Sequence, residues 1–204
     1  MMTEQELAAE LGHPEAQKLL SGSMARLAYN GHDGFPRVIP VGFYWTGDRI
    51  VVSTAPTSPK ARALSRRPHV ALTIDTGSTP EEAKALLVRG LATLQTVDGV
   101  TDEYLAAARR SMDETQLAEF EHNVRSTYQQ MVRISIEPRW ARLYDFCAGR
   151  LPAFLANLIK DRYPDSALHR GSEWGPGSDA VTARACRVVA MPPSCQPFIT
   201  SATR

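Results

Sequence analysis

The residues whose types could do chemistry in this chain gather in one short stretch before residue 75. Two hydroxyls end a run of β-branched residues there, and a serine then precedes a proline and several helix formers, two of them basic. The first amides of a helix lack partners within the helix and lie at the positive end of its dipole, so they favour a bound anion. A phosphate monoester is the anion that suits such a site. The candidate residues are Ser53, Thr54, Ser58, Lys60 and Arg62.

The same residues also have a purely structural interpretation. Lys60 and Arg62 would then belong to the solvated face of a surface helix, together with the arginines that follow them. Ser58 would be only the N-cap of that helix, and caps of this type are common. Both interpretations stay open on these residues alone.

Two strands and a helix must hold the candidate residues in place. Residues 50–54 are strand-favouring and end in the two hydroxyls. Ser58 is placed to cap a helix of about two turns that Pro68 closes, and residues 69–75 alternate as a second strand.

The chain before this stretch predicts two short helices and two strands joined by a turn. Thr3 followed by Glu6 forms a capping box, and a helix ahead of the first strand packs across an open end of a sheet or barrel. Residues 23–45 contain the two strands, which make an antiparallel meander with the strand at residues 50–54. Pro40 cannot donate to a ladder, so it belongs at an edge, at a bulge or beside a flat ligand, and a plain bulge explains it equally well.

The chain after this stretch predicts further strands and a helical insertion. A long strand at residues 84–97 contains Gly90, which indicates a bulge or a close approach of another backbone. Two helices follow at about residues 101–111 and 113–128. Two closing strands, MVRISIEP and RWARLYDF, then meet at a turn at Glu137-Pro138. Six or seven short, mostly antiparallel strands with peripheral helices predict a mainly β fold, a barrel or a sandwich.

Composition narrows the function classes. Lys and Arg total 23 against 22 acidic residues, which argues against nucleic acid or a membrane as the main partner. We expect no signal peptide and no membrane span, and the odd count of three cysteines without a CxxC motif fits a reducing cytoplasm. No metal-ligand spacing is found. We expect a domain at residues 1–150, and a second region at 151–204 with a short helix and a poorly ordered tail after about Asp165.

An ordered set of segments resembles a known family. PRVIPVGFYW, RIVVSTAPTSPKARALSRRP, HVALTID, LLVRGLATL and WARLYDF follow one another as in the FMN-binding split β-barrel proteins, the pyridoxamine 5′-phosphate oxidase-like superfamily. The flavin or deazaflavin oxidoreductase branch is the most similar. The resemblance covers about Ala8 to Phe146 and implies a split β-barrel and a homodimer with cofactor sites between the subunits.

The resemblance also implies roles for particular positions. The segments matching Val52-Ser53-Thr54 and Ser58-Pro59-Lys60 bind the cofactor phosphate in the family, and Lys60 is the strongest candidate. The strand containing Arg37, Pro40 and Val41 lies along the flavin or deazaflavin ring. Trp140 and Arg142 are candidates to reach the partner's cofactor.

The function that follows is an FMN-dependent oxidoreductase acting on a small, planar organic substrate, with the deazaflavin coenzyme F420 as the alternative cofactor. The basic C-terminal substrate motif of pyridoxamine phosphate oxidases is missing, so vitamin B6 oxidation is not expected. No catalytic residue is assigned, although Tyr29, Tyr44 and Arg89 are conceivable proton donors or substrate contacts. The alternatives are a non-catalytic protein that binds a flavin, a deazaflavin or haem, and a barrel that only dimerises.

Overall fold

The computed structural model describes residues 2–77, 79 and 82–162. Within it the chain forms two compact units. The first comprises Met1–Asp75 and Ala85–Leu143, and the second comprises Thr76–Lys84 and Tyr144–Arg204. The first unit contains the sheet and the candidate site.

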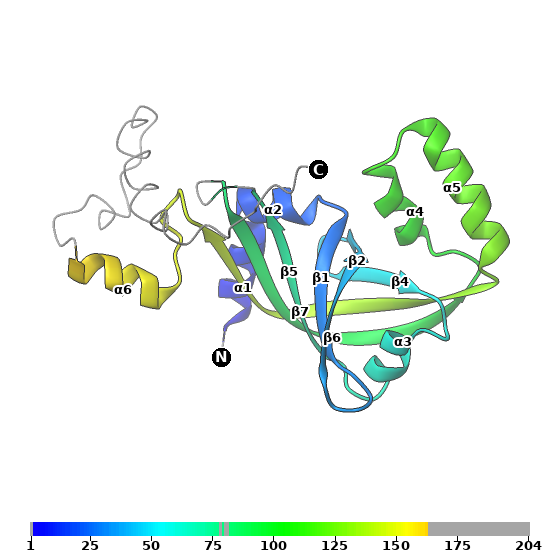
Figure 1. Ribbon diagram of the computed structural model, residues 1–204, viewed down its shortest axis with the longest axis horizontal. Helices are drawn as coiled ribbons and strands as arrows, with labels where there is room; N and C mark the ends of the chain where they lie inside the picture. The colour runs from blue at the N-terminus through cyan, green and yellow to red at the C-terminus, as the bar shows by residue number, and fades with distance from the viewer. Residues whose placement is uncertain (1, 78, 80–81, 163–204) are drawn as a thin grey trace, which may run out of the picture. The chain divides into compact units, whose positions relative to one another are not determined.

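A seven-stranded sheet forms the first unit, in the order β2-β1-β5-β6-β7-β4-β3 (Figure 1). The pairs β1–β2, β1–β5, β3–β4 and β4–β7 are all antiparallel. Together with the helices this is the mainly β architecture of a split β-barrel, as predicted. The strands are β1 (Met24–Asn30), β2 (Pro36–Gly42), β3 (Tyr44–Trp45), β4 (Ile50–Thr54), β5 (His69–Thr76), β6 (Lys84–Asp98) and β7 (Gln130–Asp145).

The chain passes directly from one edge of the sheet to the other. β2 and β3 are the two edge strands, yet they are separated in sequence only by Phe43, so the sheet closes on itself there. The Phe43 amide donates to the carbonyl of Ser23 (3.0 Å), and its side chain is fully buried. The predicted antiparallel pairing of successive strands is confirmed, but the predicted second strand is divided at Phe43 into β2, which pairs with β1, and β3, which pairs with β4 at the opposite edge.

β7 is one strand rather than two. The predicted turn at Glu137-Pro138 is wrong, because β7 runs through it from Gln130 to Asp145. From Val132 to Pro138 burial falls on even-numbered residues, and from Ala141 onward it falls on odd-numbered residues, so the strand changes face near Arg139. In the sequence, this interruption of the apolar–polar alternation resembles a turn. In the structure, it is the point where β7 changes the face of the sheet on which its buried side chains lie.

Gly90 of β6 lies against β7 at this point. A Cβ on Gly90 would stand 2.4 Å from the carbonyl oxygen of Glu137 and 2.9 Å from the side chain of Ile136. The close backbone approach predicted for Gly90 is therefore confirmed.

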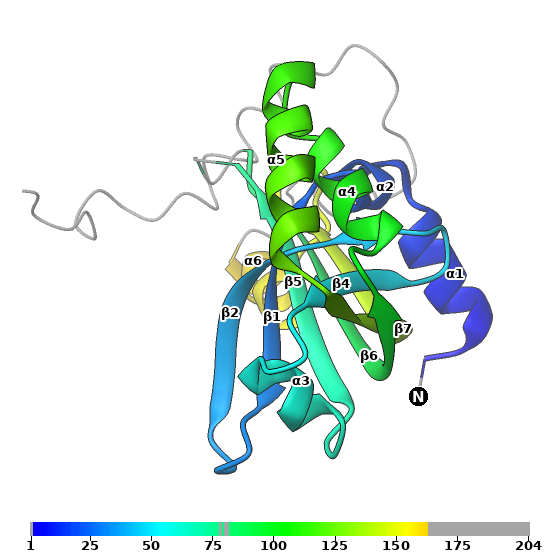
Figure 2. The ribbon, with the colours of Figure 1, turned by 90° about the vertical axis from the view of Figure 1, so that its right-hand side faces the viewer.

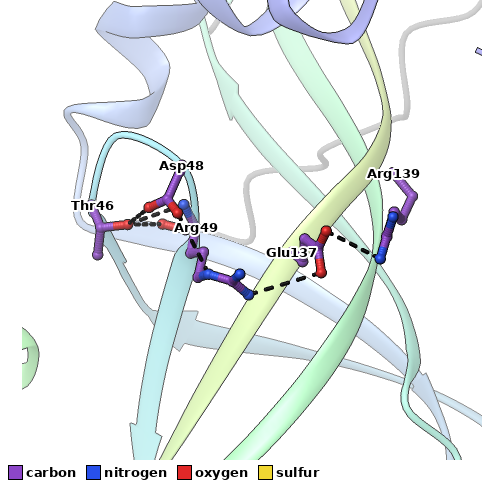
Figure 3. A network of polar contacts seen from close by, with 5 residues as sticks. All are labelled: Thr46, Asp48, Arg49, Glu137 and Arg139. Carbon is purple, nitrogen blue, oxygen red and sulfur yellow. Dashed lines mark hydrogen bonds and ion pairs between the residues drawn. The ribbon is translucent and has the colours of Figure 1, made fainter. Parts of the chain in front are cut away.

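A polar network also ties β7 to the β3–β4 turn (Figure 3). Thr46 donates to Asp48 (2.6 Å), and Arg49 lies 3.5 Å from Asp48 and 3.9 Å from Glu137. Glu137 in turn pairs with Arg139 at 3.1 Å. The network holds the turn beside the strand.

Two N-terminal helices, α1 (Glu4–Gly12) and α2 (Pro14–Leu20), precede the sheet. The capping box of Thr3 and Glu6 is present, with the Thr3 amide donating to Glu6 at 2.7 Å. Glu10 of α1 accepts from the backbone amide of Leu143 (2.8 Å) and pairs with Arg142 (3.2 Å). α1 therefore covers a part of β7 that lies beyond its pairing with β4, as expected for a helix across an open end.

A helical insertion with its own small core separates β6 from β7. α4 (Asp102–Arg109) and α5 (Glu114–Thr127) are close to their predicted bounds. The apolar stripe predicted for the second helix contributes to this core, which is distinct from the main core inside the sheet. Its members are Val100, Tyr104, Leu105, Phe120, Val124, Tyr128 and Met131.

The second unit contains the helix α6 (Ala153–Arg162), predicted at residues 151–159. Asp145 is buried, accepts from the amide of Ala148 (3.1 Å) and pairs with Lys84 (3.4 Å). The tail predicted after about Asp165 lies outside the described residues.

No helix in the described ranges is long and apolar enough to cross a membrane. Within the same residues, no group of three or more His, Cys, Asp or Glu side chains is placed to hold a metal ion.

Candidate functional site

The candidate site is built around α3 (Pro59–Leu64), the helix predicted from its serine cap. Ser58 accepts a hydrogen bond from the amide of Ala61 (3.2 Å), and Pro59 occupies the first turn. Ala61, Ala63 and Leu64 are buried, which anchors the helix to the core. Figures 1 and 2 both show α3 beside the turn that joins β1 to β2.

The first-turn amides offer less to an anion than the sequence suggested. Ser58 already occupies the Ala61 amide, and Pro59 has none. Among the described residues, the Lys60 amide is the remaining first-turn donor without a recorded partner. A helix of six residues also has a short dipole. Side chains must therefore supply most of the positive charge.

The hydroxyls at the tip of β4 are also engaged or buried. Ser53 Oγ lies 2.5 Å from Thr101 Oγ1, and Thr101 is the N-cap residue of α4. Thr101 makes no capping hydrogen bond of its own, so its hydroxyl serves the link to β4 instead. Thr54 is buried opposite Val132 of β7. These hydroxyls join the sheet to the helical insertion.

A basic cavity of about 350 Å³ lies between α3 and the β1–β2 turn. It brings together Arg37 and Arg62, two of the predicted residues, from segments 25 positions apart in the sequence. Arg67 donates to the carbonyl of Gly31 (2.9 Å) and so holds the β1–β2 turn against the chain after α3. The lining residues are Tyr29, Gly31, His32, Arg37, Pro59, Arg62, Ser65 and Arg66.

The charges in this cavity are only partly neutralised. Arg37 pairs with Asp33 at 2.6 Å. Within the described part of the chain, Arg62 and Arg66 form no ion pair. The cavity therefore carries a net positive charge.

Lys60 does not line this cavity, although its neighbour Pro59 does. Its side chain is half-buried, and this burial lowers the pKa of the Lys60 ammonium from its usual 10.5. A half-buried ammonium without a carboxylate partner among the described residues is well suited to an anionic ligand.

The remaining predicted residues lie on β2, outside the lining of the basic cavity. Pro40 is exposed on this edge strand opposite Arg26, so the edge position predicted for it is confirmed. The side chain of Val41 is buried in the core. The structure thus groups Arg37 with Arg62 in the cavity wall. The other predicted residues do not line this cavity: Ser53, Thr54, Ser58, Lys60, Pro40 and Val41.

Sequence reasoning did not place His32 or Arg66 in the site, and it named Tyr29 only as a conceivable proton donor or substrate contact. Tyr29 pairs directly with Arg37 in the β1–β2 register. Since residues that flank a hairpin turn face each other across it, the predicted turn at residues 30–34 already contained that signal.

A second, apolar cavity of about 470 Å³ lies on the outer face of β1, β5 and β6. Arg89 is part of its wall, and its guanidinium lies 4.3 Å from the ring centre of Trp140. Arg89 and Trp140 therefore contact each other within the same chain through a cation–π interaction.

Comparison with known proteins identifies the family. The sequence model described as pyridoxamine 5′-phosphate oxidase matches residues 13–143, more than half of the 204 residues. The chain belongs to the pyridoxamine 5′-phosphate oxidase family. No curated protein sequence matches this family member.

Several solved structures are similar to it at low identity. An F420 reductase is 24% identical over 61% of this chain and 94% of its own, with a TM-score of 0.47. HutZ, the haem storage protein from Vibrio cholerae, is 16% identical over 65% and 93%, with a TM-score of 0.47. General Stress Protein 26 from Bacillus anthracis str. Sterne is 17% identical over 63% and 90%, with a TM-score of 0.46.

Proposed function

We propose that this member of the pyridoxamine 5′-phosphate oxidase family binds FMN or the deazaflavin coenzyme F420, and that it is an oxidoreductase acting on a small organic substrate. The observation that supports the proposal is the convergence of Arg37 and Arg62 in one basic cavity beside α3. Both cofactors carry a phosphate, and guanidinium groups bind phosphate well. The donor set therefore fits the group.

Particular residues would hold the cofactor. Arg37, Arg62 and the half-buried Lys60 are the cations for its anionic end. Pro40 and Val41 are the β2 positions for the ring, and Val41 could offer only its backbone because its side chain is buried. Ser53, Thr54 and Ser58 keep these elements in place through the contacts described above.

The cofactor and the protein chain have separate roles in this proposal. A bound flavin or deazaflavin supplies the hydride or electron transfer. The chain binds and orients the cofactor and limits its exposure to water. A homodimer with a site at each subunit boundary is part of the proposal.

Purified full-length protein tests the proposal. We expect a visible spectrum of a flavin or a deazaflavin, the matching mass in the released cofactor, and stopped-flow reduction by a nicotinamide or by reduced deazaflavin. A protein that binds the cofactor but is never reduced would be a carrier. A colourless protein that binds neither cofactor in titrations would contradict the proposal.

A further inference from the structure

The apolar cavity on the outer face of the sheet continues into a second hollow along the same strands. The cavity has a volume of about 470 Å³ and the hollow about 410 Å³, and Ala28 of β1 and Ala71 of β5 line both. These two alanines pair in the β1–β5 register, and both are only partly exposed. Val38 of β2 lies on one side of them and Arg89 of β6 on the other. Because the alanine side chains are small, they form the floor of one trough, the outer trough.

One end of the outer trough is electrically neutral. Arg26 of β1 and Asp75 of β5 both line the second hollow, and they form an ion pair with each other. Thr73 and Ala85 also line this end and carry no charge. The described residues at this end therefore offer a ligand no unbalanced charge.

The other end carries an unbalanced guanidinium. Arg89 lines the apolar cavity and forms no ion pair within the described residues. Its stacking on Trp140, at 4.3 Å from the ring centre, leaves the N–H groups at the edge of the guanidinium available. Arg139 lines the same wall but pairs with Glu137 at 3.1 Å. Arg89 is thus the permanent cation of this wall that no described carboxylate balances.

This distribution of charge selects the class of ligand. One unbalanced cation at one end of a mostly apolar trough is complementary to one anionic group on an apolar body. A carboxylate fits the edge of a guanidinium through two parallel hydrogen bonds. A phosphate monoester carries about two negative charges and would leave one of them unbalanced here. The cavity volume is within the range of sites for small organic ligands.

We propose that the outer trough binds an apolar monocarboxylic acid, with its carboxylate on Arg89 and its apolar body over Ala28 and Ala71. The trough borders β2 through Pro36 and Val38, and β2 is the strand proposed for the flavin or deazaflavin ring. The acid is therefore the substrate class of the proposed oxidoreductase, and to that extent the inference rests on the proposed function. Binding of the acid itself requires no cofactor.

Calorimetric titration with 2-naphthoate and 2-naphthalenemethanol tests the role of Arg89, because the two probes share an apolar body and differ in the carboxylate. Full-length wild-type protein should bind the acid about tenfold or more tightly than the alcohol. Arg89→Ala should abolish this preference, and Arg89→Lys should retain part of it. Arg109→Ala is the matched control, since Arg109 is an exposed arginine of α4 outside the trough. Equal affinities in wild type, or an unchanged preference in Arg89→Ala, would overturn the proposal.

A substitution in the floor tests the location. Ala71→Leu should weaken binding of both probes by about tenfold or more, because the larger side chain occupies the space of the apolar body. Ala118→Leu, at an exposed position of α5, is the control, and thermal melting followed by circular dichroism checks that both variants fold. Unchanged probe affinity in a folded Ala71→Leu protein would refute the trough as the binding site.

The probes carry no redox group, so they separate this inference from the proposed function. Binding of 2-naphthoate that depends on Arg89 would support the site even in a protein that binds neither FMN nor F420. A protein that holds either cofactor but binds neither probe would refute the carboxylate site and leave the proposed function intact. If no probe binds and sedimentation velocity shows a dimer that Ala71→Leu dissociates, the trough is instead a contact between two copies of the chain.

Discussion

Lys60 shows how burial tunes a single cation near the site. The ammonium is half-buried beside the wall residue Pro59, and desolvation lowers its pKa. A bound anion would compensate for the lost hydration and would raise that pKa again. Charge on Lys60 and occupancy of the site are therefore thermodynamically linked.

Replacing Lys60 by Ala should weaken cofactor binding by about 1.5–3 kcal/mol, the range of a hydrogen bond to a charged group. Fluorescence titration of the full-length protein with FMN and with F420 measures this change. Lys60→Arg is the control, because it keeps the charge. Equal dissociation constants for Lys60→Ala and wild type would remove Lys60 from the site.

The pH dependence of binding follows from the same residue. Below its lowered pKa Lys60 is charged and anion affinity is at its maximum. As the pH rises through that pKa, which lies below 10.5, the unliganded protein loses the proton and affinity should fall. Lys60→Arg should remove this fall, since a guanidinium stays protonated over the range. A wild-type affinity that stays flat up to pH 10.5 would contradict the assignment.

At the scale of single residues, the sequence predicted those parts of the site that depend on local rules. Ser58 and Pro59 gave the position of α3 because capping is local. The first-turn amides were expected to be open to an anion, but the amide of Ala61 already donates to the capping hydroxyl of Ser58. Arg66 was missed, and Tyr29 was named without a place in the site, because the lining of the cavity depends on the fold of the hairpin against α3.

At the scale of elements, predictions were correct for helices and weaker for strand pairing. The capping boxes of α1 and α5 and the apolar stripe of α5 mark those helices within the sequence itself. The continuity of β7 and the split of β2 from β3 depend instead on strands far away in the chain. The alternation of apolar and polar residues along a strand does not show which other strand it pairs with.

The contact between β6 and β7 can be tested with two glycines. Gly90→Ala should lower the free energy of unfolding by about 2–4 kcal/mol, because its Cβ would meet the Glu137 carbonyl at 2.4 Å and neither backbone can easily move. Gly12→Ala is the matched control, since nothing lies within 4 Å of its Cβ in α1. Urea denaturation should show Gly12→Ala within about 0.5 kcal/mol of wild type or slightly more stable. Equal stabilities of the two variants would disprove the close approach.

At the scale of the whole molecule, the core and the cavity belong to the same unit. The buried cluster inside the sheet and all residues of the basic cavity lie within Met1–Asp75 and Ala85–Leu143.

Removing the residues after about Asp165 should therefore leave cofactor affinity unchanged within about twofold. Titration of the truncated protein measures this, and sedimentation velocity at the same concentration reports its subunit count. Loss of the cofactor or of the dimer on truncation would show that the tail completes the site or the interface.

The single-residue link between β2 and β3 has a consequence for how the barrel opens. In an ordinary open sheet either border can fray while the other stays intact. Here the two edge strands, β2 and β3, are joined directly through Phe43, so displacement of one edge strand also displaces the other. Tyr29 and Arg37 belong to the β1–β2 hairpin, which forms one of those borders. Separation of β2 from β3 at Phe43 would therefore also disrupt the basic cavity.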